Sequence, residues 1–315
     1  MAFLFSAIRL ARWLQQCSAW KYLLLQYFLP CAPVSVRERE KEKSSDQRKL
    51  EEMPDHLRFN PWILTAYRPA NQSTLQCIKS ICSLHNETFN IVSHGLPILY
   101  VLLNGDQLLP PAEDRLPSYL PYCHLISCLS PWLGSFLYHV FMNHKAGPEL
   151  YRRLLQADMA GIWITQTFGA LTTLTVSFLT FGDPFRRAFL LLYLATACWA
   201  LHRGLTAGSA WQRALSFAPL VIMRALALVA RLSTSQVVVH SWHLVHVLNQ
   251  EVLPILGAFI SAARIPERFS PGAFDLALNS HNLMHCLVLL GGLHMHFCYL
   301  IDIEIIRSGA VPYDA

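Results

Sequence analysis

The chain has 315 residues, of which 53% are hydrophobic and 14% are charged. Soluble domains contain about 25% charged residues, so this composition excludes an ordinary soluble protein and indicates a chain that lies in a lipid bilayer. The formal net charge of +5 comes from short basic clusters between apolar runs, and we therefore expect no nucleic-acid partner.

The first 56 residues predict an N-terminal interfacial helix followed by a charged linker. Residues 1–16 mix arginines into an apolar stretch and lack a small-residue cleavage site, which is typical of an amphipathic helix on a membrane surface. The run REREKEKSSDQRKLEE over 37–52 is almost purely charged and predicts a solvated segment. The segment RFNPWILTAYRP over 58–69 has the composition of a headgroup interface and is too short to span.

Residues 57–303 predict an all-α membrane domain, a bundle of seven transmembrane helices, followed by a short C-terminal tail at 304–315. Each apolar run is close to the roughly 20 residues that cross a bilayer. The predicted spans are approximately 88–108, 119–142, 157–181, 185–206, 212–232, 243–263 and 277–301. Arg224 falls inside the fifth span, where it would either reach a headgroup or face the bundle, since an unpaired arginine costs at least about 2.5 kcal/mol there.

The distribution of basic residues predicts a cytosolic N-terminus and an outside C-terminus. The second-to-third and fourth-to-fifth loops hold an excess of lysine and arginine over acidic residues, whereas the first-to-second loop is mainly acidic. Two glycosylation sequons, at Asn71 and Asn86, precede the first span. In this orientation they would be cytosolic and unmodified, and glycosylation at either one would invert the topology.

Polar residues gather at the ends of three predicted spans. Ser135 and His139 are four residues apart at the end of the second span, as are His281 and His285 at the start of the seventh, so each pair shares one helical face. Asp158 opens the predicted third span. In a chain of seven spans these three ends lie at one membrane face, so the residues converge in either orientation.

Three neutral imidazoles, from His139, His281 and His285, would leave one position of a tetrahedral Zn²⁺ ion open, as in catalytic zinc sites. Asp158 could then hold a zinc-bound water and accept its proton, and the Ser135 hydroxyl could donate to a carbonyl oxygen, with a membrane-lipid amide as the target. The nine cysteines contain no C-x-x-C pair and indicate no thiolate site. The alternative is that these side chains only pair with one another across helices, which we favour for any single histidine but not for the set.

Other polar residues allow weaker hypotheses. A stripe of Asn86, Glu87, Asn90 and His94 at the first span would form a second shell around the site or line a substrate entrance, or else cap and join helices. His240, His243 and His246 recur every three residues, and we expect them at the opposite face as interfacial histidines. His294 and His296 diverge by about 200° on a helix and are expected to pack separately.

Five motifs in order carry a resemblance to a known family: HNETFNIVSH, SFLYH, DMAGI, RIPERFSPGAFD and NSHNLMH. The chain resembles the progestin and adipoQ receptor family, related to bacterial haemolysin-III-like proteins, over about residues 57–300, and resembles one vertebrate member most. The resemblance implies seven helices, a cytosolic N-terminus, zinc on His139, His281 and His285, Asp158 near the zinc-bound water and Ser135 beside it.

The same resemblance implies a ceramidase-like hydrolase that acts on ceramide in the bilayer and regulates sphingolipid metabolism at the Golgi membrane. Adiponectin-binding members carry tyrosine and serine where this chain has Met159 and Ala160, so adiponectin recognition does not carry over. An outside protein or steroid ligand stays open. The rival interpretation is a receptor or lipid-sensing scaffold with a purely structural zinc and no turnover, and Asp158 is the residue that distinguishes the two.

Overall fold

The computed structural model describes residues 47–108, 118–233 and 241–308, and within these ranges it contains helices and isolated bridges but no strand. The α-helices are α3 (Thr74–Ser80), α4 (Thr88–Leu108), α5 (Tyr119–Phe141), α6 (Gly147–Phe168), α7 (Leu171–Ser177), α8 (Asp183–Thr206), α9 (Ala210–Ser216), α10 (Ala218–Ser233), α11 (Ser241–Ala263) and α12 (Ser280–Ser308). Four short 3₁₀ helices in the described ranges are η1 (Leu50–Glu52), η2 (Asp55–Leu57), η3 (Leu179–Phe181) and η4 (Glu267–Phe269). The prediction of an all-α chain is confirmed for the described residues.

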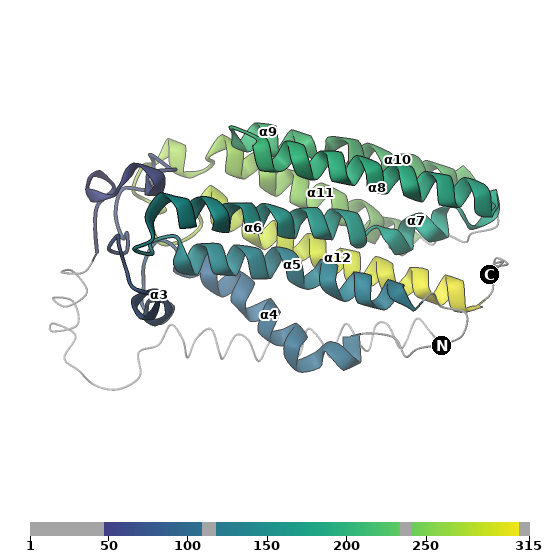
Figure 1. Ribbon diagram of the computed structural model, residues 1–315, viewed down its shortest axis with the longest axis horizontal. Coiled ribbons are helices and arrows are strands. Elements are labelled where there is room, and N and C mark those ends of the chain that lie inside the picture. Colours follow the sequence, from purple (N-terminus) through teal and green to yellow (C-terminus); the bar gives the residue numbers. More distant parts are fainter. Residues whose placement is uncertain (1–46, 109–117, 234–240, 309–315) are drawn as a thin grey trace. The chain divides into compact units, whose positions relative to one another are not determined.

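The long helices run side by side along one axis, and α3 and residues 47–73 gather at one end of the bundle (Figure 1). Helix α5 packs along α6, and α11 packs along α12, while α4 contacts both α5 and α12. The end of α5 and the start of α12 meet near α3, since His139 contacts His281 and His144 pairs with Gln72. This end holds the candidate site.

The outward surface of the bundle is apolar in the way that a bilayer requires. Leu102, Leu191, Val229 and Phe259, on four different helices, are between 53% and 68% exposed. Four helical stretches of the described chain are long and apolar enough to cross a membrane: Asp183–Thr206, Trp211–Ser233, Trp242–Ala263 and Ser280–Ser308. Exposed leucine, valine and phenylalanine on such helices are stabilised by contact with lipid rather than water.

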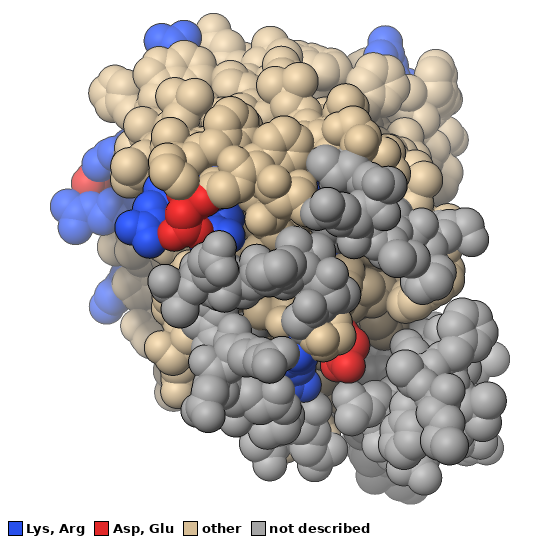
Figure 2. Space-filling view, turned by 90° about the vertical axis from the view of Figure 1, so that its right-hand side faces the viewer, with Lys and Arg blue, Asp and Glu red and all other residues tan. Residues whose placement is uncertain are grey.

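The end of the bundle opposite α3 carries charged side chains in a few groups among uncharged surface (Figure 2). In the first turn of α8, Asp183 pairs with Arg186 and, at 2.6 Å, with Arg187. These charges therefore lie at the end of α8 and not along its apolar side.

Several predicted boundaries need correction. Helix α6 begins at Gly147, ten residues before the predicted third span, because Glu149 pairs with Arg152 and Arg153 one turn apart and these charges extend the helix beyond its apolar part. Asp158 therefore lies in the middle of α6. Helix α12 continues to Ser308, past the predicted domain end at 303.

The compact unit of the described chain also includes residues before 57, the predicted start of the membrane domain. The compact unit begins at Gln47, and Met53 and Leu57 are each 1% exposed in a cluster with Tyr67, Tyr138 and Met142. Residues 47–56 are thus part of the folded unit, because apolar side chains between the charges of this segment find a core. The predicted interfacial helix and the first part of the charged linker lie outside the described residues.

Glycines bring α5 and α6 into close contact. A Cβ added to Gly134 would lie 2.8 Å from the carbonyl oxygen of Ala157 and 2.9 Å from the Cα of Asp158. A Cβ at Gly161 would collide with the backbone of Ser130 and Pro131. Small residues that let helix backbones approach in this way are typical of membrane helix pairs.

The arginine in the fifth predicted span faces the bundle and not the headgroups. Its guanidinium donates two hydrogen bonds to the carboxylate of Glu251 on α11, at 2.6 and 2.7 Å, and a third to the Tyr193 hydroxyl on α8 at 3.0 Å. The Arg224 side chain is 8% exposed and that of Glu251 is 23% exposed. The pair offsets the penalty that either charge would face alone in this setting.

Candidate metal centre

Three histidines from two helices form the centre. His139 lies in the last turn of α5, and His281 and His285 lie in the first two turns of α12. Each offers one ring nitrogen, and these atoms lie within 4.8 Å of one another. The Nε2 atoms of His139 and His281 are 3.3 Å apart. In the part of the chain that the structure describes, this is the only group of three or more metal-ligating side chains.

This geometry fits a tetrahedral metal ion. Two nitrogens bound to one zinc at about 2.0–2.1 Å lie roughly 3.3 Å apart, which is the observed Nε2 separation. The other nitrogen of each ring is occupied: Nδ1 of His139 lies 2.7 Å from Glu87, and Nδ1 of His285 lies 2.9 Å from Ser93. Nδ1 of His281 has a longer contact, of 3.5 Å, with Ser261. Nδ1–H donation by a ring leaves the Nε2 lone pair free for a metal.

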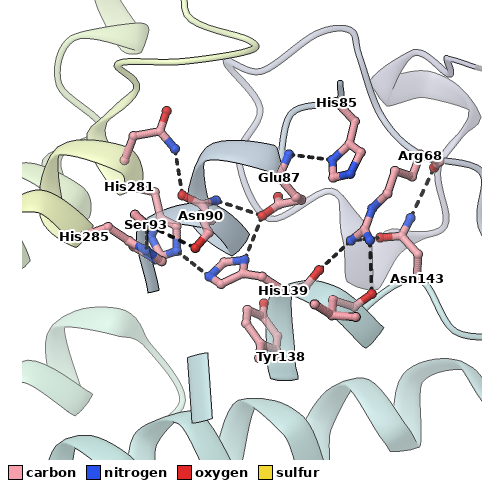
Figure 3. A network of polar contacts seen from close by, with 12 residues as sticks. Arg68, His85, Glu87, Asn90, Ser93, Tyr138, His139, Asn143, His281 and His285 are labelled. Carbon is pink, nitrogen blue, oxygen red and sulfur yellow. Dashed lines mark hydrogen bonds and ion pairs between the residues drawn. The ribbon is translucent and has the colours of Figure 1, made fainter. Parts of the chain in front are cut away.

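A chain of hydrogen bonds extends from His139 into α4 and α12 (Figure 3). Oε2 of Glu87 accepts from His139 Nδ1 and, at 2.8 Å, from Asn90 Nδ2. Oδ1 of Asn90 accepts from Asn282 Nδ2 at 2.7 Å. Burial raises the pKa of Glu87, but the hydrogen bonds from His139 and Asn90 outweigh it and lower that pKa to about 2. The carboxylate therefore stays ionised and orients the ring.

The four residues of the predicted second shell take different positions. Glu87 contacts His139 directly, and Asn90 acts through Glu87. The ring of His94 stacks on that of His285, with centroids 3.9 Å apart. Asn86 donates its backbone N–H to Ala66 and lines a pocket of about 10 Å³ beside His281, which has room for about one water molecule.

Ser135 and Asp158 lie one turn deeper than His139. Ser135 is 3% exposed on α5. Asp158 is half-buried on α6, and its Cα lies next to Gly134. Ser135 and Asp158, the two predicted site residues that are not histidines, thus lie on the closely packed helices α5 and α6.

Arg68 is a residue of this centre that the sequence reasoning missed. It is 3% exposed, and its guanidinium donates to the backbone oxygens of His139 and Val140 at 2.6 and 3.1 Å, to the Ser80 hydroxyl and to Asn143. These bonds satisfy carbonyls at the end of α5, which have no helical partner. The only signal was a second arginine in the interfacial segment, which composition cannot distinguish from a headgroup contact.

Glu267 fixes the start of α12 on the other side of the centre. It is fully buried, accepts the backbone N–H of Ser280 at 2.7 Å and accepts from Asn60 at 3.0 Å. A carboxylate at a helix N-terminus satisfies free N–H groups and is favoured by the helix dipole. Glu267, which belongs to the fourth sequence motif, therefore fixes the start of α12, one residue before His281.

The other described histidines of α5, α11 and α12 have partners outside the group of three. His294 pairs with His246, Nδ1 to Nδ1 at 2.7 Å, and His296 pairs with His124 at 2.9 Å, so the expected divergence of His294 and His296 is confirmed. His243 is not interfacial: it is 1% exposed and lies 3.4 Å from Asp302, which is paired with Arg231. The Asp302 carboxylate on α12 therefore gives His243 a buried partner, which its spacing in the sequence does not indicate. His240 lies outside the described residues.

Comparison with known proteins places the chain in a family. The model of the family described as haemolysin-III related matches residues 82–297. The progestin and adipoQ receptor family member 4 proteins of Homo sapiens and Mus musculus are each 36% identical over 264 residues, 83% of this chain and 94% of theirs. Heptahelical transmembrane protein 1 of Arabidopsis thaliana is 28% identical over 297 residues, covering 80% of each chain.

The resemblance drawn from the five motifs, including the likeness to the fourth vertebrate member, is therefore confirmed. The match and the helices long enough to span a bilayer together show that the chain is an integral membrane protein. The chain belongs to the haemolysin-III-related family and, within it, to the progestin and adipoQ receptors.

Proposed function

We propose that the chain binds one Zn²⁺ ion through His139, His281 and His285 and uses it to hydrolyse the amide of a membrane lipid. One observation carries the proposal: three rings converge through one nitrogen each while the opposite nitrogens contact Glu87, Ser93 and Ser261. Three protein ligands leave the fourth position open, which distinguishes catalytic from structural zinc sites.

The residues around the metal have separate roles in this reaction. Bound zinc would lower the pKa of a coordinated water toward about 7. Asp158 would accept a proton from the attacking water, and the same carboxyl would return it to the leaving amine. The Ser135 hydroxyl donates to the carbonyl oxygen as negative charge develops on it. A ceramide-like lipid supplies an amide at the required place and yields a sphingoid base and a fatty acid.

The proposed topology has seven spans, formed by α4, α5, α6 with α7, α8, α10, α11 and α12, with a cytosolic N-terminus. Four crossings, by α6, α8, α10 and α11, then separate the end of α5 from the start of α12, so His139 and His281 fall on one membrane face. Their contact supports this count. The excess of basic residues in the loops of that face supports its cytosolic assignment.

We further propose that the protein controls ceramide levels in the Golgi membrane. This location rests on the resemblance to the fourth family member. In a Golgi bilayer the substrate would reach the centre laterally, between helices, and not from water.

Replacement of Asp158 by Asn tests the hydrolase directly. The amide still fits the site but cannot accept a proton at neutral pH, so release of fatty acid from ceramide should fall by about 10²-fold or more while bound zinc and folding persist. Glu149→Gln, an exposed acid in the first turn of the same helix, is the matched control and should keep full activity.

The second candidate function is a receptor in which the metal only joins α5 to α12. The names of the relatives from Homo sapiens and Mus musculus, progestin and adipoQ receptor family member 4, favour it. A receptor of this kind would contain stoichiometric zinc, release no fatty acid, and respond equally well to its ligand with Asp158→Asn.

A further inference from the structure

His94 is buried in a way that packing does not explain. It lies on α4, one turn after Asn90, and is 4% exposed. Its ring lies nearly parallel to that of His285, with an interplanar angle of 15° and centroids 3.9 Å apart. The ring therefore borders the candidate metal centre next to His285.

Both ring nitrogens of His94 lack a hydrogen-bond partner among the described residues, and no other buried histidine in these ranges leaves both nitrogens unpaired. The neighbours of His94 differ in this respect, since Ser93 contacts His285 and Asn90 contacts Glu87. A buried polar group without a partner costs about 1–3 kcal/mol. A phenylalanine would stack on His285 just as well without this cost, so the nitrogens themselves require an explanation.

The stacked geometry argues against a fourth metal ligand. The nitrogen lone pairs of an imidazole lie in the plane of its ring. The rings of His94 and His285 lie in nearly parallel planes displaced by the stacking distance, so their lone pairs do not converge on one point. A group that reaches His94 would sit beside the metal position, where the rest of a bound substrate would lie.

We propose that His94 is a substrate-binding residue that hydrogen-bonds the polar part of the lipid next to its scissile bond. This inference rests on the proposed function and adds to it a residue that contacts the substrate. A neutral imidazole offers one donor and one acceptor. The matching ligand group carries both an N–H or O–H and an oxygen acceptor, as an amide or a hydroxyl does, which favours hydroxylated amide lipids over simple esters.

Two variants separate the nitrogens from the ring. His94→Phe keeps the stacking and removes both nitrogens, whereas His94→Gln keeps one donor and one acceptor. Three quantities are measured on detergent-purified full-length protein: zinc per chain, the melting temperature without added lipid, and the binding of a short-chain ceramide. We expect wild-type zinc in both variants and a melting temperature of His94→Phe at or above that of the wild type. Ceramide binding should weaken about tenfold in His94→Phe and much less in His94→Gln.

Each contrary result has a distinct meaning. Unchanged ceramide binding by His94→Phe, with binding by the wild type intact, overturns the role of His94 and leaves the hydrolase proposal standing. Loss of zinc or a lowered melting temperature in His94→Phe, with no separate loss of ceramide binding, makes the residue structural and also overturns it. Failure of the wild type to bind ceramide overturns the proposed substrate together with this role. His94→Met provides the same test if phenylalanine prevents folding.

Discussion

Glu87 illustrates how single residues determine the properties of the centre. Its buried carboxylate holds Nδ1 of His139 at 2.7 Å, which fixes the ring and makes Nε2 a better ligand. The charge is maintained by the hydrogen bonds that lower its pKa to about 2. A carboxylate behind a histidine ligand is the arrangement that strengthens metal binding in known zinc sites.

Replacement of Glu87 by Gln should therefore weaken zinc binding without unfolding the protein. The glutamine oxygen can still accept from His139, but the negative charge is lost, and we expect affinity to fall about 10- to 100-fold. Competition with a chelator of known affinity measures this. Glu149→Gln serves again as the control, and equal zinc affinity in Glu87→Gln would show that the carboxylate has no part in the site.

At the residue scale, the sequence predicted those side chains whose spacing has a chemical meaning. Helical four-residue spacing paired His281 with His285 and Ser135 with His139, and the structure brings the three histidines together. Ser93, Ser261 and Arg68 were not predicted, because a serine or an arginine near a helix end has many ordinary roles. Only the three-dimensional arrangement distinguishes a ring partner from a cap.

At the scale of elements, the α5–α6 contact sets the distance between Asp158 and the histidines. Gly134→Ala would introduce a methyl group 2.8 Å from the backbone of Ala157 and force these helices apart. We expect a loss of about 1–3 kcal/mol in the free energy of unfolding and reduced turnover. Zinc should be retained, because the three histidines meet at the contact between α5 and α12. Thermal unfolding in detergent and fatty-acid release measure the two effects.

Gly105→Ala on α4 is the matched control, since a Cβ there meets no atom within 4 Å. It should leave both the unfolding temperature and turnover unchanged or slightly raise the first, because alanine favours helix over glycine. Equal behaviour of the two variants would mean that the close α5–α6 approach is unimportant.

The Arg224–Glu251 pair joins α10 to α11 and predicts a non-additive effect. Glu251→Leu leaves the Arg224 charge without its counterion, and because Glu251 is partly exposed we expect the lower end of the range for breaking a buried pair, about 3 kcal/mol. The double variant Arg224→Met with Glu251→Leu removes both charges and should recover most of that loss. Denaturant unfolding measures the cycle, and additive losses would contradict a coupled pair.

Helix boundaries were the least predictable feature of the elements. Hydropathy places the start of the third span where apolar residues begin, but α6 starts ten residues earlier, at Gly147, because ion pairs and a proline in its first turn stabilise a polar extension. The start of α4 at Thr88, in contrast, equals the predicted start of the first span, since a polar break precedes it. Composition indicates whether a segment lies in lipid or in water, but it does not show at which residue its helix begins.

At the scale of the whole molecule, the centre ties together the two ends of the folded chain. His139 lies at the end of the second long helix and His281 at the start of the last, and Glu87 comes from the start of the first. Metal binding at this point would therefore hold α5 and α12 together whether or not a reaction takes place there. For this reason a receptor and a hydrolase can share the same three histidines.

The most direct test of the central claim measures zinc and turnover in the same preparations. Wild-type protein and His285→Ala, purified in detergent or nanodiscs, are assayed for bound zinc and for release of fatty acid from ceramide. The proposal predicts one zinc per wild-type chain with turnover, and loss of both in His285→Ala. Zinc without turnover would contradict the hydrolase and favour the receptor, and wild-type protein without zinc would contradict the metal centre itself.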